Sequence, residues 1–252
     1  MFTAAIALWV AAAPSTKDFE EYARAAQEFE AMVSRVGAVG AMPRITDTRV
    51  ARLVSTLSDE RRFLSSPFPP DPNDRSFEVC SRSTRAVVAY MMSGTGSLAG
   101  VDPGTAARRI QAQMAKNTLN YQDELAMLMP FVTRCHGRLA VALAEWVRAR
   151  NVAGFADVQR EGLAQMRLGI LQTYLGALIS AGDTALKESF RERLLRAAAD
   201  SASAFSAILT LEGRRSVLQA LRSFPIGRTL TVHAARIEKE MSRTDCQGLC
   251  AL

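Results

Sequence analysis

Apolar side chains recur every three or four residues through most of this chain. After Pro14, for example, they stand at Phe19, Tyr22, Ala26 and Phe29. This spacing puts them on one face of an α-helix, whereas a half-buried strand needs strict alternation of apolar and polar residues. The sequence shows no alternating segment longer than a few residues and no repeat of constant period. The chain therefore has to bury its apolar surface by packing helices on helices.

The same spacing predicts about seven or eight helices in an irregular all-α bundle with no significant sheet. Ser15 or Thr16 can cap the first helix, and a second helix is expected from Asp47 to Leu64. The longest expected helices cover residues 121–150, 156–180 and 184–211. Sustained heptads are missing, which argues against a long coiled coil.

Two segments interrupt the helical pattern. Residues 65–75 hold four prolines together with Asp and Asn, which excludes the interior of a helix. Residues 93–104 are rich in glycine and end near Asp102-Pro103, a pair typical of a helix start. This second segment lacks the preceding strand and the Gly-Lys-Ser/Thr ending of a phosphate-binding loop. One core is the simpler arrangement, so we expect residues 13–252 to form a single helical domain with two internal breaks.

Composition agrees with a folded, globular chain. The 252 residues are 48% hydrophobic and 22% charged, which is enough for a sizeable core. The formal net charge is +6, but acidic residues stand among the basic ones in every basic segment of the C-terminal part. These charges are therefore expected to lie on solvated helix faces. A nucleic-acid-binding surface, which needs one uncompensated basic face, is not expected.

Residues 1–12 resemble a short signal peptide. An apolar run from Ala4 to Val10 is followed by small residues, and Val10-Ala11-Ala12 fits a cleavage site. No lysine or arginine precedes the apolar run, and the segment is shorter than a usual signal. A frayed apolar helix on the surface of the fold is the alternative interpretation. We expect export to the periplasm or the medium, with the cytoplasm as the alternative location.

No segment is expected to span a membrane. The strongest candidate, residues 168–181, has 14 residues and contains Gln172. A spanning helix needs about 20 apolar residues. This segment therefore predicts a helix of the protein core.

Four cysteines give the clearest chemical signal: Cys80, Cys135, Cys246 and Cys250. In an exported protein an even number of cysteines indicates disulfides, and four cysteines allow three connectivities. We favour Cys80–Cys135, which joins two expected core helices, and Cys246–Cys250, where Gly248 lets the chain turn. In a cytosolic protein all four would stay reduced. The C-x3-C spacing of the last pair differs from the C-x2-C spacing of thioredoxin-like redox motifs.

Two other uses of these cysteines fit the sequence poorly. Cys135, His136, Cys246 and Cys250 could supply zinc ligands, but adjacent residues on a helix diverge by about 100°. The paired C-x2–4-C spacing of structural zinc sites is also absent. A prenylation motif needs its cysteine fourth from the end, whereas Cys250 is third. No metal or other cofactor is therefore expected.

No catalytic motif is recognisable, and no catalytic residue is assigned. The two histidines, His136 and His233, belong to no nucleophile or metal-binding motif. Glu145 and Glu161 lie on expected helices without the Glu-x2-His pairs of di-iron bundles. An enzyme site would have to assemble from distant positions, with His136, Glu145 and His233 as its candidates.

Six methionines at helical spacing allow two interpretations. They are Met91, Met92, Met114, Met127, Met129 and Met166. Methionine fills irregular gaps in protein cores, and it also lines adaptable binding grooves. Core packing is the simpler interpretation.

The sequence predicts the fold better than the function. We expect an exported, disulfide-stabilised helical protein that has a structural role or binds a protein partner or a small apolar ligand. Two alternatives stay open. One is an enzyme whose site lies in a pocket of the bundle, and the other is a cytosolic adaptor or regulator with a basic surface.

Overall fold

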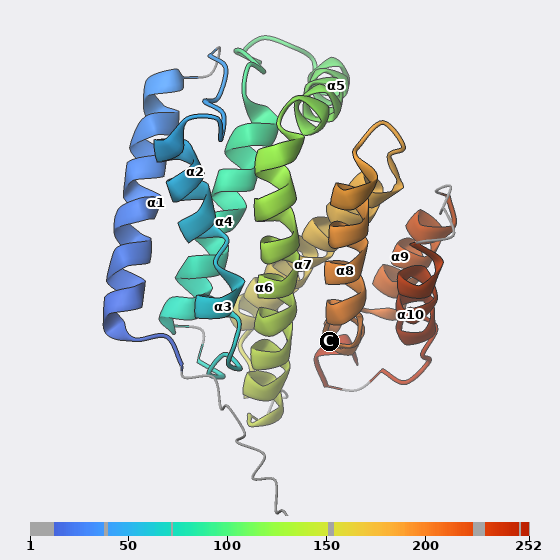
Figure 1. The fold of residues 1–252 in the computed structure, drawn as a ribbon. Helices are drawn as coiled ribbons and strands as arrows, with labels where there is room; N and C mark the ends of the chain where they lie inside the picture. The colour runs from blue at the N-terminus through green and yellow to red at the C-terminus, as the bar shows by residue number, and fades with distance from the viewer. Residues whose placement is uncertain are drawn as a thin grey trace, which may run out of the picture.

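The computed structural model describes residues 13–37, 40–71, 73–150, 154–223, 230–246 and 248–251. Within these residues the chain is helical, with no strand, and nine of its helices have ten or more residues (Figure 1). The elements are α1 (Thr16–Val36), α2 (Thr48–Leu57), α3 (Glu60–Phe63), α4 (Arg75–Met92), α5 (Pro103–Asn120), α6 (Gln122–Arg148), α7 (Asp157–Gly182), α8 (Glu188–Ile208), α9 (Leu211–Ser223), α10 (Thr231–Met241) and the 3-10 turn η3 (Gly248–Ala251). The all-α fold class is confirmed. The predicted signal segment, residues 1–12, lies outside the described residues.

Helix starts are set by local side-chain caps. The Ser15 hydroxyl accepts a hydrogen bond from the Asp18 amide, and the Asp18 carboxylate accepts one from the Ser15 amide at 2.8 Å. This reciprocal pair is a capping box, and Ser15 rather than Thr16 is the cap of the first helix. Asp102 caps α5 through a single hydrogen bond, because its carboxylate accepts from the Thr105 amide at 2.9 Å, and Pro103 occupies the first turn.

The expected second helix, from Asp47 to Leu64, is wrong in its length. It ends at Leu57, and α3 begins separately after Asp59. The Asp59 carboxylate accepts from the Arg62 amide at 3.0 Å, so Asp59 acts as a helix cap where the periodicity predicts helix interior. The apolar spacing continues across the break because Leu57 and Phe63 are both buried in the same core.

The N-terminal helices pack as one layer. Helices α1, α2 and α4 contact one another, and Figure 1 shows them side by side on one flank of α6. The buried Tyr22 hydroxyl in α1 donates to the carbonyl oxygen of Val79 at 2.7 Å and lies 2.6 Å from the Ser83 hydroxyl. Because both partners belong to α4, this buried tyrosine fixes the register of α1 on α4.

Helix α6 is the central element. It contacts α2, α4, α5, α7, α8 and η3. It packs closely on α8 at Gly137, where a Cβ atom would lie 2.7 Å from the Ser201 hydroxyl oxygen. A side chain at this position would clash with Ser201, so α6 and α8 meet at a residue without a side chain.

A buried carboxylate holds the loop between α1 and α2. Glu124, in the first turn of α6, is fully buried and accepts from the Ile45 amide at 2.8 Å and from the Arg44 guanidinium at 3.0 Å. The Tyr121 hydroxyl accepts from the Met42 amide at 3.0 Å. These bonds satisfy main-chain donors that would otherwise be buried without partners.

The C-terminal part packs on α8. Helix α7 crosses behind α6 and α8 in Figure 1 and contacts both of them as well as α9. Helices α9 and α10 contact each other, and α10 lies against α8. Buried apolar side chains form one connected cluster from Tyr22 in α1 to Leu249 in η3.

Candidate functional site

A cleft with a volume of about 750 Å³ lies between α4 and α7. Both of these helices pack on α6, so α6 forms the floor and the other two form the walls. Met114 of α5 also lines the cleft. Cavities of 300–1,000 Å³ are typical of small-molecule sites in proteins.

Four helices each contribute one methionine to this cleft: Met91 from α4, Met114 from α5, Met129 from α6 and Met166 from α7. We call it the methionine cleft. Core packing, the simpler interpretation of these residues, fits Met129, which is buried, but not Met166, which is 37% exposed. The flexible thioether side chains can adjust to an apolar molecule of irregular shape.

The side of the cleft formed by α7 carries two residues without side chains. The face of α7 that lines the cleft includes Gly169, Thr173 and Gly176, which are three or four residues apart. A Cβ atom at either glycine would meet no atom outside its own helix within 4 Å. Glycine inside a helix costs about 1 kcal/mol relative to alanine. Packing therefore does not require these two glycines, and their effect is to leave space in the cleft.

One polar ring lies in the floor. Nε2 of His136 is 3.2 Å from the Thr84 hydroxyl oxygen, which joins α6 to α4. Nδ1 of the same ring is buried and has no hydrogen-bond partner among the described residues. Burial lowers the pKa of His136 to about 4, since desolvation disfavours the charged ring. The ring is therefore neutral at physiological pH.

A cysteine pair ties the wall of the cleft to its floor. Cys80 in α4 and Cys135 in α6 lie at disulfide distance, with their Cα atoms 5.6 Å apart. This is the pairing favoured from the sequence, and the geometry meets the requirement of a disulfide. Cys80 is one turn from Thr84, and Cys135 adjoins His136. The bridge position therefore fixes the spacing of α4 and α6 beside the polar ring.

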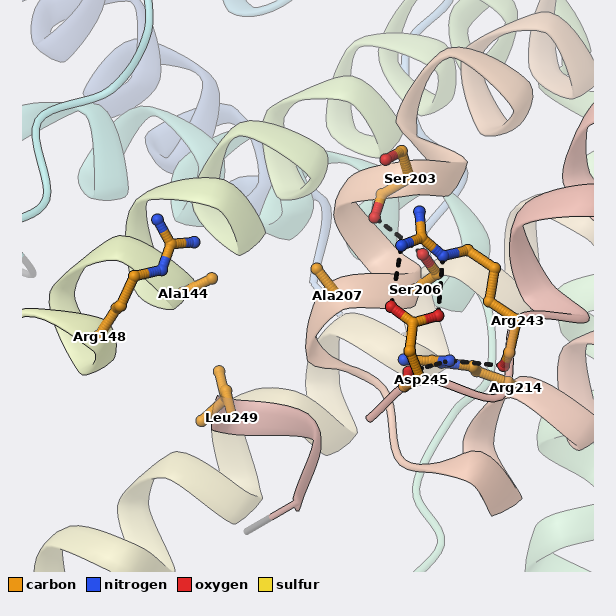
Figure 2. A pocket seen from close by; sticks show the side chains of 9 residues that line it. All are labelled: Ala144, Arg148, Ser203, Ser206, Ala207, Arg214, Arg243, Asp245 and Leu249. Carbon is orange, nitrogen blue, oxygen red and sulfur yellow. Dashed lines mark hydrogen bonds and ion pairs between the residues drawn. The ribbon is translucent and has the colours of Figure 1, made fainter. Parts of the chain in front are cut away.

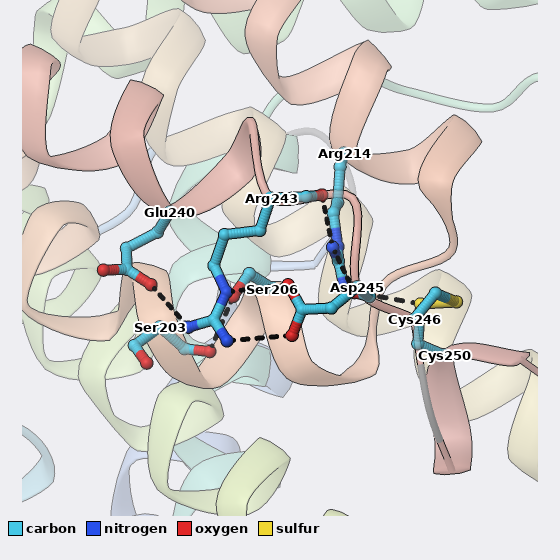
Figure 3. A network of polar contacts seen from close by, with 8 residues as sticks. All are labelled: Ser203, Ser206, Arg214, Glu240, Arg243, Asp245, Cys246 and Cys250. Atoms are coloured by element: carbon cyan, nitrogen blue, oxygen red, sulfur yellow. Dashed lines mark hydrogen bonds and ion pairs between the residues drawn. A yellow bond between two sulfur atoms is a disulfide. The ribbon is translucent and has the colours of Figure 1, made fainter.

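The second pair, Cys246 and Cys250, also lies at disulfide distance, with Cα atoms 5.3 Å apart. Figure 3 shows Arg214 of α9 reaching toward this pair. Its guanidinium donates to the carbonyl oxygens of Arg243 and Asp245 at 2.7 Å and 2.9 Å and contacts the Cys250 sulfur at 3.4 Å. Arg214 is only 4% exposed, so these contacts anchor the C-terminal segment inside the fold.

A smaller polar cavity of about 340 Å³ lies next to this network (Figure 2). Arg148, Arg214, Arg243 and Asp245 line it, together with Ser203 and Ser206. The Asp245 carboxylate binds the Arg243 guanidinium through two contacts, at 2.8 Å and 3.0 Å, and this hydrogen bonding lowers the pKa of Asp245. Two of the three arginines are thus already engaged by the C-terminal segment. We interpret this cavity as part of the anchoring of that segment.

The three candidates for an enzyme site are not brought together. His136 lines the methionine cleft, whereas Glu145 is exposed on α6 and His233 lies on α10, and neither of these lines the cleft. Zinc ligands are not assembled either, because Cys135 lies with Cys80 and Cys246 with Cys250. Across the described ranges, no three His, Cys, Asp or Glu side chains are grouped as metal ligands.

Among the described helices, none combines the length and the apolar character that a bilayer crossing requires. Comparisons of the chain with protein-family models, curated proteins and solved structures found no match.

Proposed function

We propose that this chain is an exported binding protein, stabilised by disulfides, that holds a small apolar molecule in the methionine cleft. One observation carries the proposal: a cleft of about 750 Å³ is built from one methionine of each of four helices and two glycines that packing does not require. Such a combination of size and apolar lining is typical of ligand sites.

The lining favours binding over acid–base catalysis. Arg85 and His136 are the ionisable side chains among the described lining residues. Arg85 pairs with Glu30 at 3.2 Å, and His136 is kept neutral by burial. A general base needs a pKa near the operating pH and a position within hydrogen-bond reach of the proton that it takes. The lowered pKa of His136 does not suit this role.

Export is supported by the cysteines. All four belong to pairs at disulfide distance, and such pairs persist in oxidising compartments. The Cys80–Cys135 pair stands beside the cleft, so oxidation would also stabilise the proposed site.

The test is binding of N-phenyl-1-naphthylamine, a neutral apolar dye whose fluorescence rises in apolar surroundings. We expect saturable binding to the wild-type protein and about tenfold weaker binding to Gly176→Leu, because leucine fills the space that the dye occupies. The variant should fold, since residue 176 has open space beside it.

Gly162→Leu is the matched control. Gly162 lies on the same helix, is exposed, has equally open surroundings and does not line the cleft. Equal dye affinity for Gly176→Leu and Gly162→Leu would show that the dye binds elsewhere, and absence of saturable binding would exclude the proposed function for this class of ligand.

A further inference from the structure

The hydrogen bonds of Thr84 determine which nitrogen of His136 carries the proton. The Thr84 hydroxyl donates to the carbonyl oxygen of Cys80, one helical turn earlier, at 2.8 Å. A hydroxyl has a single proton, so toward His136 the same oxygen can only accept. Nε2 of His136, 3.2 Å away, is therefore the protonated nitrogen of a neutral ring.

Nδ1 of His136 is then a bare acceptor. It is buried, and no donor among the described residues reaches it. Buried acceptors in folded proteins nearly always have a hydrogen-bond donor, and leaving one without a donor is unfavourable. The group that completes this ring has to bring an O–H or an N–H.

The charges around the cleft disfavour an anionic ligand. Arg85 is the one charged side chain among the described lining residues, and its guanidinium pairs with Glu30 at 3.2 Å. Glu30 also pairs with Arg82, which in turn binds Glu78. A carboxylate entering the cleft would therefore find no uncompensated cation, and moving it out of water is costly.

We propose that the ligand of the methionine cleft is a neutral apolar molecule with one hydroxyl or N–H group, which donates a hydrogen bond to Nδ1 of His136. The inference rests on the proposed function, because it concerns the occupant of the same cleft. Neighbouring atoms cover Nδ1, so ligand entry has to be accompanied by side-chain rotamer changes, which are common on binding.

The experiment compares three competitors with twelve carbons each: 1-dodecanol, its isomer undecyl methyl ether, and dodecanoate. Each displaces N-phenyl-1-naphthylamine from the wild-type protein. The alcohol should bind about fivefold more tightly than the ether, since the ether has the oxygen but not the proton. Dodecanoate, an anion at neutral pH, should bind more weakly than the alcohol.

Two variants assign this preference to the ring. His136→Phe keeps a ring in the floor but removes the acceptor, so the alcohol and the ether should bind equally. Thr84→Val removes the partner that holds the proton on Nε2, so the preference for the alcohol over the ether should shrink.

Nitrogen NMR of the imidazole rings supplies a readout that needs no ligand and would expose a merely structural role. His136 should show the Nε2–H tautomer in the wild-type protein, and His233, on α10, serves as the internal reference. The Nδ1–H tautomer would overturn the inference. Equal affinity for the alcohol and the ether, or tighter binding of dodecanoate than of the alcohol, would also overturn the inference. These three results would leave the cleft as a binding site. Failure of the dye to bind, in contrast, would reject the proposed function itself.

Discussion

Burial acts on His136 through the protonation equilibrium of its ring. The pKa of His136 falls from an ordinary value of 6.5 to about 4. Between these two pH values the unfolded chain therefore binds a proton at His136, whereas the folded chain does not. Stability therefore increases with pH between these two values and is lost as the pH falls through them. The same group that shapes the cleft also makes the fold sensitive to acid.

We expect the wild-type protein to lose about 2–3 kcal/mol of unfolding free energy through His136 between about pH 7 and pH 4. His136→Gln removes this contribution, because glutamine does not titrate. Urea unfolding of both proteins across this range measures the difference. A parallel pH dependence of the two proteins would show that His136 is not held neutral by the fold.

At the scale of helices, the contact between α6 and α8 depends on one missing side chain. A Cβ atom at Gly137 would lie 2.7 Å and 2.8 Å from Oγ and Cβ of Ser201. Rotation of the hydroxyl relieves the first contact but not the second, because Ser201 Cβ moves only with the backbone of α8.

Gly137→Ala should therefore destabilise the protein by about 1–3 kcal/mol, although alanine is the better helix former. Gly162→Ala provides the opposite expectation on α7, where the surroundings are open: it should stabilise by up to about 1 kcal/mol. Thermal or urea unfolding compares the two. Stabilisation by both substitutions would mean that α6 and α8 can separate at no cost.

The ends of the helices show which parts of the fold can be predicted from the sequence. Caps at Ser15 and Asp102 were predictable because each involves residues within three positions of one another. The break at Asp59 was not, since apolar spacing continues through it. Residues 168–181 were predicted as a core helix, and Tyr174 and Leu178 are indeed buried, but Leu168 and Ile179 are exposed.

The cleft itself lay beyond prediction for a physical reason. Helical spacing tells which side chains share a face, but not which faces meet, so four methionines on four helices could not be assigned to one place. The glycines of α7 were the available signal. Their spacing along one face of α7 indicates a cleft only when that face is known to lie opposite α4 and α6.

In the molecule as a whole, the two cysteine pairs differ in what surrounds them. Cys80 and Cys135 are fully buried between two helices. Cys246 is half-buried, and Cys250 lies 3.4 Å from the Arg214 guanidinium. When an external thiolate attacks the sulfur of Cys246, Cys250 leaves as a thiolate beside this buried cation. A stabilised leaving thiolate speeds such an exchange.

We expect both pairs to be oxidised in protein isolated from its native host, and a mild thiol reductant to open Cys246–Cys250 before Cys80–Cys135. Two equivalents of reductant thiol then become one disulfide. Alkylation followed by peptide mass spectrometry follows each cysteine. Free thiols before reduction would contradict export, and the reverse order of opening would contradict the role of burial.

Arg214→Met should slow the opening of Cys246–Cys250, because the cation next to the leaving sulfur is gone. Arg222→Met is the control on the same helix, since Arg222 pairs with Glu238 and is exposed. If Cys246–Cys250 opens at the same rate in the two variants, Arg214 anchors the C-terminal segment but does not affect thiol–disulfide exchange.

The bridge between α4 and α6 also bears on how the chain responds to proteases. Cys80 and Cys135 enclose the glycine-rich segment at residues 93–102, which contains exposed positions and three glycines with positive φ. Exposed loop tips of this kind are preferred sites of cleavage. With the bridge oxidised, a single cut there yields two fragments that stay covalently joined. In a compartment that is both oxidising and rich in proteases, the molecule can thus be cut at this exposed turn without coming apart.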